Sequence, residues 1–181
     1  MNKKYRVLHI FSGFGGGISS LILNLTTNKS DDMVFDTLAF SYKGGEAFVE
    51  KMENLGAHCY LMPRPRAEGF GLFSKTVASV FSENKYDAVH CHISGFRALP
   101  FKRAAKANGI KPFIIHAHSG RYDSRSDRLL HSVNKRINYK VATDYFTCSD
   151  IAARYIFGEK YLKKRNALLI PNGIDKTKFE K

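Results

Sequence analysis

Residues 5–17 read Tyr5-Arg6-Val7-Leu8-His9-Ile10-Phe11-Ser12-Gly13-Phe14-Gly15-Gly16-Gly17. A short apolar run that ends in glycines is typical of a buried strand leading through a tight turn into a helix. The helix is predicted over residues 16–28, where apolar residues recur at helical spacing from Ile18 to Leu25. The chain therefore starts with one strand–turn–helix unit.

The same unit repeats along the chain, and this alternation predicts an α/β fold. We expect a doubly wound, Rossmann-like parallel sheet of about seven strands with helices on both faces. The predicted strands are residues 5–11, 34–40, 58–62, 88–91, 112–116, 145–148 and 167–170. The predicted helices are residues 16–28, 45–55, 71–82, 96–108, 127–141 and 149–157, with an apolar stripe of Phe73, Val77, Val80 and Phe81 in the third and of Leu129, Leu130, Val133 and Ile137 in the fifth.

Composition places the protein among soluble or peripheral proteins. The chain has 181 residues, enough for one domain, and no apolar run as long as the roughly 18 residues of a membrane helix. Its three cysteines, Cys59, Cys91 and Cys148, lie in or beside apolar runs without a CxxC pair, which predicts buried free thiols in a reducing cytoplasm. The net charge of +13 suits nucleic acid, anionic lipid or phosphorylated ligands, or is simply a solvated surface.

The glycine turn after the first predicted strand is the first candidate ligand site, because ligands of such sheets bind at the carboxyl ends of the strands. Gly15, Gly16 and Gly17 allow close approach of a ligand, and free amides at a helix start favour a phosphate. The run is not a dinucleotide fingerprint, since Ile18 stands where the third glycine would fall. A phosphate loop ending in GK[ST] is absent as well.

Two His-x-His pairs end neighbouring predicted strands: His90 with His92, and His116 with His118. Four imidazoles at one sheet edge raise the possibility of a metal site, but no carboxylate stands close by in sequence, and we predict no metal. We expect His90 and His116 to be packed, hydrogen-bonded strand residues. We expect His118 to face the ligand cleft, while His92 is open to either interpretation.

Polar residues after these strands complete the candidate site. Ser94 follows His92, and Ser119 and Arg121 follow His118 in a loop able to contact hydroxyls and phosphates. No DxD motif occurs anywhere in the chain, which argues against an Asp-bound metal clamping a nucleotide diphosphate. No GxSxG nucleophile motif occurs either.

The last segment, Ala167-Leu168-Leu169-Ile170-Pro171-Asn172-Gly173-Ile174-Asp175, is a short strand that runs into a Pro-Asn-Gly turn. We interpret residues 1–170 as an N-terminal Rossmann-like domain and residues 171–181 as the start of an interdomain linker. Asn172, Gly173 and Asp175 are the candidate hinge. A second domain is expected beyond it, and the sequence leaves open whether nature or truncation separated the two.

Several short stretches, in order along the chain, carry a family resemblance: Gly16-Gly17-Ile18, Phe35-Asp36, Leu55-Gly56, residues 86–92, residues 115–119, Cys148-Ser149 and residues 170–175. Together they resemble the N-terminal half of a GT-B glycosyltransferase of family 4, nearest to bacterial capsular or exopolysaccharide enzymes. One departure is Ser19, at a position where such enzymes often carry Glu.

The resemblance implies one half of a two-domain sugar transferase that retains anomeric configuration without metal or cofactor. In this reading the nucleotide-sugar is a substrate held mainly by a C-terminal donor-binding domain, in cis or in trans. The resemblance makes His118 the catalytic contact to the transferred sugar and places Gly16-Gly17 against the donor diphosphate or acceptor. Together with the residues at the strand ends, the predicted site has Gly15, Gly16 and Gly17 as the phosphate turn and His92, Ser94, Ser119 and Arg121 as acceptor contacts. The acceptor would be a saccharide or a lipid-linked sugar.

Other interpretations stay open from the sequence alone. The chain can be a non-catalytic basic module that binds anionic membrane or nucleic acid, or the acceptor subunit of a split glycosyltransferase. The transferase interpretation predicts a cytoplasmic protein, optionally peripheral on the inner face of the membrane, with no nucleic-acid partner. Residues 1–181 alone are expected to be inactive, because the groups that hold the donor are not among them.

Overall fold

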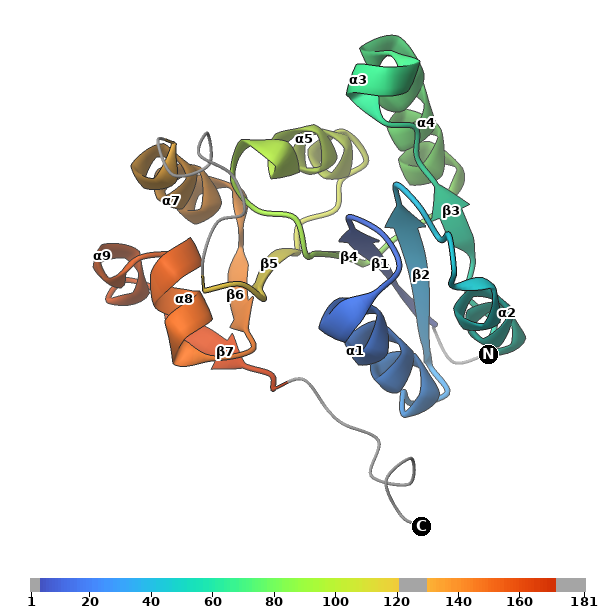
Figure 1. The fold of residues 1–181 in the computed structure, drawn as a ribbon, viewed down its shortest axis with the longest axis horizontal. Coiled ribbons are helices and arrows are strands. Elements are labelled where there is room, and N and C mark those ends of the chain that lie inside the picture. The colour runs from blue at the N-terminus through green and yellow to red at the C-terminus, as the bar shows by residue number, and fades with distance from the viewer. Residues whose placement is uncertain (1–3, 121–129, 172–181) are drawn as a thin grey trace.

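Seven parallel strands form one sheet in the computed structural model, which describes residues 4–120 and 130–171 (Figure 1). Their order across the sheet is β3-β2-β1-β4-β5-β6-β7, so the chain winds outward in both directions from β1 and β4. This confirms the doubly wound α/β prediction. The strands are β1 (Tyr5–Phe11), β2 (Met33–Ala39), β3 (Cys59–Leu61), β4 (Ala88–Cys91), β5 (Phe113–Ala117), β6 (Asp144–Thr147) and β7 (Ala167–Leu169).

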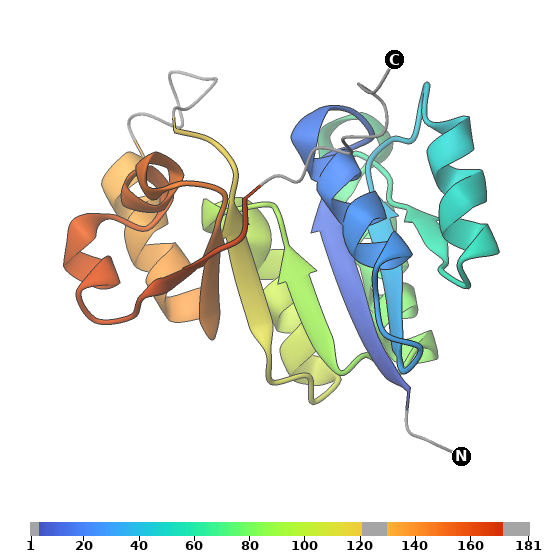
Figure 2. The same cartoon turned by 90° about the horizontal axis from the view of Figure 1, so that it is seen from below.

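Helices cover both faces of the sheet, as predicted. Figure 1 shows α1 and α2 on one face and α4, α5 and α7 on the other, and Figure 2 shows α1 in front of β1. No helix in residues 4–120 or 130–171 is both long and apolar enough to cross a membrane. The helices are α1 (Gly16–Thr27), α2 (Glu46–Asn54), α3 (Pro65–Glu68), α4 (Phe70–Glu83), the 3-10 turn η1 (Gly95–Ala98), α5 (Leu99–Ala107), α7 (His131–Val141), α8 (Asp150–Ile156) and α9 (Glu159–Leu162).

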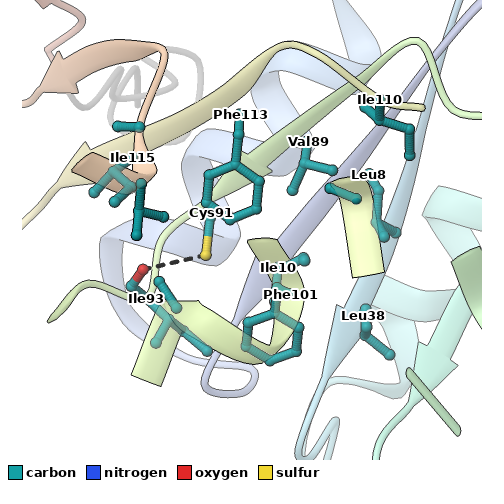
Figure 3. Close-up of a cluster of buried hydrophobic side chains, with 14 of the residues drawn as sticks. Leu8, Ile10, Leu38, Val89, Cys91, Ile93, Phe101, Ile110, Phe113 and Ile115 are labelled. Atoms are coloured by element: carbon teal, nitrogen blue, oxygen red, sulfur yellow. Dashed lines mark hydrogen bonds between the residues drawn. The ribbon is translucent and has the colours of Figure 1, made fainter. Parts of the chain in front are cut away.

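The main core lies between the sheet and the helices α4, α5 and α7. Figure 3 shows its centre, which includes Leu8, Ile10, Val89, Cys91, Phe113 and Ile115. Successive residues of a strand point to opposite faces. His9, His90 and His116 alternate with these core residues, so their rings point to the face on which α1 lies.

Most predicted elements are confirmed with boundary shifts of a few residues, and three features differ from the prediction. The predicted helix 96–108 is split into η1 and α5, with Pro100 in the first turn of α5, where a missing backbone N–H costs nothing. Two four-residue helices, α3 and α9, were not predicted, because they are too short to show periodicity. Of the cysteines only Cys91 is fully buried, although all three are free.

The apolar stripe predicted for α7 is confirmed only at Ile137, which packs partly buried against the core, and Leu129 lies outside the described residues. Leu130 and Val133 are 40% and 53% exposed, while Asn134 and Asn138 are buried. The Asn138 side chain accepts a hydrogen bond from the Gly95 N–H at 2.6 Å and donates one to the Ile156 carbonyl at 3.0 Å. The helix therefore turns an amide face inward, because buried backbone groups of the loop after β4 need partners.

A second asparagine strengthens this attachment. The Asn134 carboxamide oxygen accepts from the Phe96 N–H at 3.2 Å. A Cβ on Gly95 would lie 2.6 Å from Asn134, and Gly95 has a φ of +69°, so both the backbone conformation and the contact require glycine. The turn that follows β4 is thus fixed to α7.

A buried ion pair joins the strands on the other side of β1. Asp36 in β2 is fully buried; its carboxylate lies 2.8 Å from the Arg6 guanidinium in β1 and accepts from the His58 N–H at 2.8 Å. The carboxylate therefore links β1, β2 and the start of β3.

We expect Asp36→Asn to lower the free energy of unfolding by about 3 kcal/mol, because it leaves the Arg6 charge without its buried partner. Urea unfolding followed by circular dichroism measures the change. Asp31→Asn removes the charge of an exposed carboxylate nearby and should stay within about 0.5 kcal/mol. Equal effects of the two substitutions would contradict a structural role for the ion pair.

Candidate functional site

The glycine turn at the carboxyl end of β1 is open to solvent. Gly15 and Gly16 have φ values of +127° and +66°, and a Cβ on either would meet no atom within 4 Å. The backbone conformation, rather than crowding, therefore requires glycine here. No side chain caps the start of α1, and Gly17 is exposed in its first turn. The turn presents backbone amides that are suited to an anion.

Ser19, the residue that departs from the family pattern, holds this turn from within. It is buried, and its hydroxyl accepts from the Gly15 N–H at 2.9 Å. A serine side chain is short enough to make this contact inside α1. This role could not be predicted from the sequence, because a lone serine in a helix has no diagnostic pattern.

Five histidines lie side by side at the carboxyl ends of three neighbouring strands. His92 is at the centre: its Nδ1 lies 2.8 Å from Nε2 of His118, and its Nε2 lies 3.1 Å from Nδ1 of His9. His90 Nε2 lies 3.0 Å from His116 Nδ1. We call these five residues the histidine cluster.

Strand pairing places the cluster. In the parallel register His9 of β1 is the partner of His90 in β4, and the two rings lie with centroids 4.7 Å apart. The His92 N–H donates to the Ile10 carbonyl at 2.8 Å. His92 therefore lies beside the end of β1, immediately before the glycine turn. β1 and β4 begin the two opposite windings of the sheet, which is where such folds bind ligands.

The structure separates the four predicted histidines as expected. His90 and His116 are buried and hydrogen-bonded to each other, which confirms them as packed strand residues. His92 and His118 are half-buried at the strand ends. His9 is the member that sequence reasoning missed, because it looked like an interruption of an apolar strand. Its position in the same register as His90 was the available signal.

The remaining predicted residues are placed only in part. Ser94 is half-buried just before η1, and Ser119 is exposed directly after His118. Arg121 and the hinge residues Asn172, Gly173 and Asp175 lie outside the described residues.

Burial keeps the cluster uncharged at neutral pH. Desolvation lowers the pKa of His9 and of His116 to about 3, and that of His118 to about 4. The pKa values of His90 and His92 are also well below the usual value, because burial and then the neighbouring imidazoles disfavour a positive charge. A neutral imidazole can donate one hydrogen bond and accept another, so His118 can contact a hydroxyl without bringing a charge.

The cluster should make the fold sensitive to acid. The native pKa values of the histidines are lowered, so below about pH 6.5 the unfolded chain binds more protons than the native state. The free energy of unfolding therefore decreases as the pH is lowered. Each fully neutral histidine costs about 2 kcal/mol at pH 5 by this linkage. We expect the free energy of unfolding to drop by several kcal/mol between pH 7 and pH 5, measured by urea unfolding with EDTA present.

His9→Gln removes one such group and should reduce the drop by about 2 kcal/mol. The exposed His58→Gln should leave the drop unchanged. A free energy of unfolding that stays level from pH 7 to pH 5 would mean that the native cluster accepts protons.

Comparison with known proteins gives matches over nearly the whole chain. Residues 15–178 match the sequence model of Glycosyltransferase Family 4. EpsF of Bacillus subtilis (strain 168), a protein named as a glycosyltransferase, is 30% identical over 184 residues. The match covers 96% of this chain and 46% of EpsF, so the chain spans about half the length of that relative.

Solved structures share the fold at low sequence identity. A UDP-N-acetylglucosamine 2-epimerase has a TM-score of 0.64 at 14% identity, over 94% of this chain and 49% of that one. Anabaena Alr3699/HepE, solved with UDP and glucose, has a TM-score of 0.61 at 16% identity, over 96% and 46%. Acinetobacter baumannii MurG has 0.57 at 16%, over 97% and 47%. These structures show the fold alone, and the family match over residues 15–178 shows that the chain belongs to glycosyltransferase family 4.

Proposed function

We propose that this chain is the N-terminal, acceptor-side domain of a glycosyltransferase in bacterial surface polysaccharide synthesis. The enzyme would move a sugar from a nucleotide-sugar to a saccharide or lipid-linked acceptor. Family membership and the similarity to EpsF support this function. The observation that carries it is the position of His118, half-buried at the end of β5, in a hydrogen-bonded chain that leads through His92 to the end of β1.

In the proposed reaction each group has a separate task. The amides of Gly16 and Gly17 bind a phosphate of donor or acceptor, while Gly15, whose N–H is bonded to Ser19, shapes the turn. His118 contacts the transferred sugar as a neutral imidazole, and its hydrogen bond to His92 fixes the orientation of the ring. Ser94, Ser119 and Arg121 bind the acceptor. The phosphate turn and the cleft histidine need no cofactor.

A second domain would hold the donor, in cis or in trans, and transfer would retain the anomeric configuration without a metal. Residues 171–181, with the candidate hinge at Asn172, Gly173 and Asp175, would lead toward that domain. The chain spans 46% of EpsF, which is consistent with one domain of two. Residues 1–181 alone would then lack turnover.

The competing interpretation is a non-catalytic basic module that binds nucleic acid. Family membership favours the transferase. Mixing the protein with labelled oligonucleotides at increasing salt tests the competitor. Strong binding with a steep salt dependence would favour it.

We expect His118→Ala, made in the whole protein that carries this chain, to lower kcat at least ~100-fold, because a preorganised contact to the reacting sugar is lost. The free energy of unfolding should change by about 1 kcal/mol or less, since the side chain is half-buried. Transfer of labelled sugar from nucleotide-sugars to membrane lipid extracts measures kcat.

His58→Ala is the matched control, because His58 is exposed and remote in sequence from the cluster. Its kcat should equal that of the unaltered protein. If His118→Ala also kept its kcat, His118 would be a structural residue and the proposed site would be wrong.

A peripheral position on an anionic membrane is the second part of the proposal. The corner formed by α3 and the start of α4 carries Phe70 and Leu72, which are 64% and 52% exposed (Figure 1). Arg64, Arg66 and Lys75 are exposed on the same short segment. Exposed apolar side chains next to basic ones suit the boundary between headgroups and acyl chains.

We expect the double variant Phe70→Ser, Leu72→Ser to bind anionic liposomes at least tenfold more weakly, because each apolar side chain loses about 1.5 kcal/mol of burial in the bilayer. Flotation with phosphatidylglycerol vesicles measures the bound fraction. Ile151→Ser is the control, since Ile151 is 71% exposed on α8. Equal binding by the double variant and the control would refute this surface.

A further inference from the structure

The histidine cluster contains a group of three imidazoles that the transferase function does not require as a set. His92, His116 and His118 each offer one ring nitrogen, and these three nitrogens lie within 4.8 Å of one another. The ring centroids of His116 and His118 are 4.0 Å apart, and that of His92 lies 5.4 Å and 5.0 Å from them. The three rings therefore lie side by side at the ends of β4 and β5.

The spacing is close to that of a tetrahedral metal site. Zn–N bonds are about 2.0–2.1 Å, so two imidazole nitrogens on one zinc ion lie about 3.3 Å apart. The His92 Nδ1 and His118 Nε2 atoms, now 2.8 Å apart, would have to separate by about half an ångström. The other pairs, within 4.8 Å, would have to approach.

The group of three histidines also has a buried ring nitrogen without a hydrogen-bond partner among the described residues. Nε2 of His116 is buried and has no hydrogen-bond partner among the described residues, although the residue is only 1% exposed. A buried polar atom without a partner costs about 1–3 kcal/mol. Binding an ion through this nitrogen would remove that cost.

The hydrogen bonds behind two of the three rings, those of His116 and His92, suit ligation. When Nε2 of His116 binds an ion, its Nδ1 carries the proton and donates to Nε2 of His90, 3.0 Å away. When Nδ1 of His92 binds, its Nε2 carries the proton and donates to Nδ1 of His9, 3.1 Å away. Metal-bound histidines in proteins are held in this way by acceptors on the opposite nitrogen.

The geometry and the composition of the group lead us to propose that His92, His116 and His118 form a binding site for a borderline divalent ion such as Zn²⁺. Neutral imidazoles without a carboxylate favour zinc, copper, nickel or cobalt over magnesium and calcium. His92 and His118 are half-buried, so an ion reaches the site from the same side as the proposed sugar. Three protein ligands leave a fourth position for water.

Protonation does not oppose binding at neutral pH, since burial lowers the pKa of His116 to about 3 and of His118 to about 4. An ion in this site replaces the hydrogen bond between His92 and His118 that orients His118 in the proposed reaction. Zinc is therefore expected to inhibit a transfer that itself needs no metal. This inhibition rests on the proposed function, whereas the ion site does not.

Titration of the EDTA-stripped chain with Zn²⁺ tests the site by calorimetry, and Co²⁺ supplies a visible absorption band that reports tetrahedral coordination. We expect one ion per chain and no binding of Mg²⁺. His118→Gln should weaken Zn²⁺ binding at least tenfold, and His58→Gln should not change it. His116→Gln should also weaken it, with circular dichroism confirming that this buried variant is folded.

The proposal is overturned if Zn²⁺ does not bind, if His118→Gln binds it as tightly as the unaltered chain, or if His58→Gln loses as much affinity as His118→Gln. Because no sugar donor or acceptor enters the titration, its failure leaves the transferase proposal standing. Loss of the transferase proposal equally leaves a measured ion site intact.

Discussion

The parallel pairing of β1, β4 and β5 is the constraint on which the site depends. Side chains alternate along each strand, so a register that sends Leu8 and Val89 into the main core sends His9 and His90 to the opposite face. A slip of one residue would bury leucine where histidine now lies and would empty the core. The same strand register thus determines both the position of the histidines and the packing of the core.

Much of the fold was predictable, because each strand–turn–helix unit has a recognisable pattern of residues within its own short segment. Gly109 and Gly158 end the helices before them with φ values of +72° and +82°, and Ser149 caps α8 by accepting from the Ala152 N–H at 3.2 Å. The stripe of α4 that includes Phe73 and Val77 is buried as predicted. At these positions the turn glycines, the helix cap and the apolar periodicity all favour the element that the structure contains.

The site was predictable only where it follows from topology. His92 and His118 end their strands, and the rule for open α/β sheets places strand ends at the ligand edge. Long-range polar contacts carry no local signal. Helical periodicity assigned Val133 to the core, but Val133 is exposed and Asn134 and Asn138 are buried instead. These asparagines meet buried backbone groups that no apolar residue can satisfy. The partner of His92 on β1 was hidden in the same way.

The amide contacts of α7 also define how the edge of the site can behave. Backbone groups of Gly95 and Phe96 are bonded to one helix, and the Asn138 that holds Gly95 is itself bonded to the carbonyl of Ile156 at the end of α8. A ligand that pushed this segment aside would have to break both of its hydrogen bonds to α7, a helix that is itself bonded to α8. The segment after β4 is therefore a rigid side of the site rather than a lid. Selectivity for a ligand along this segment must come from the shape that the segment has before the ligand binds.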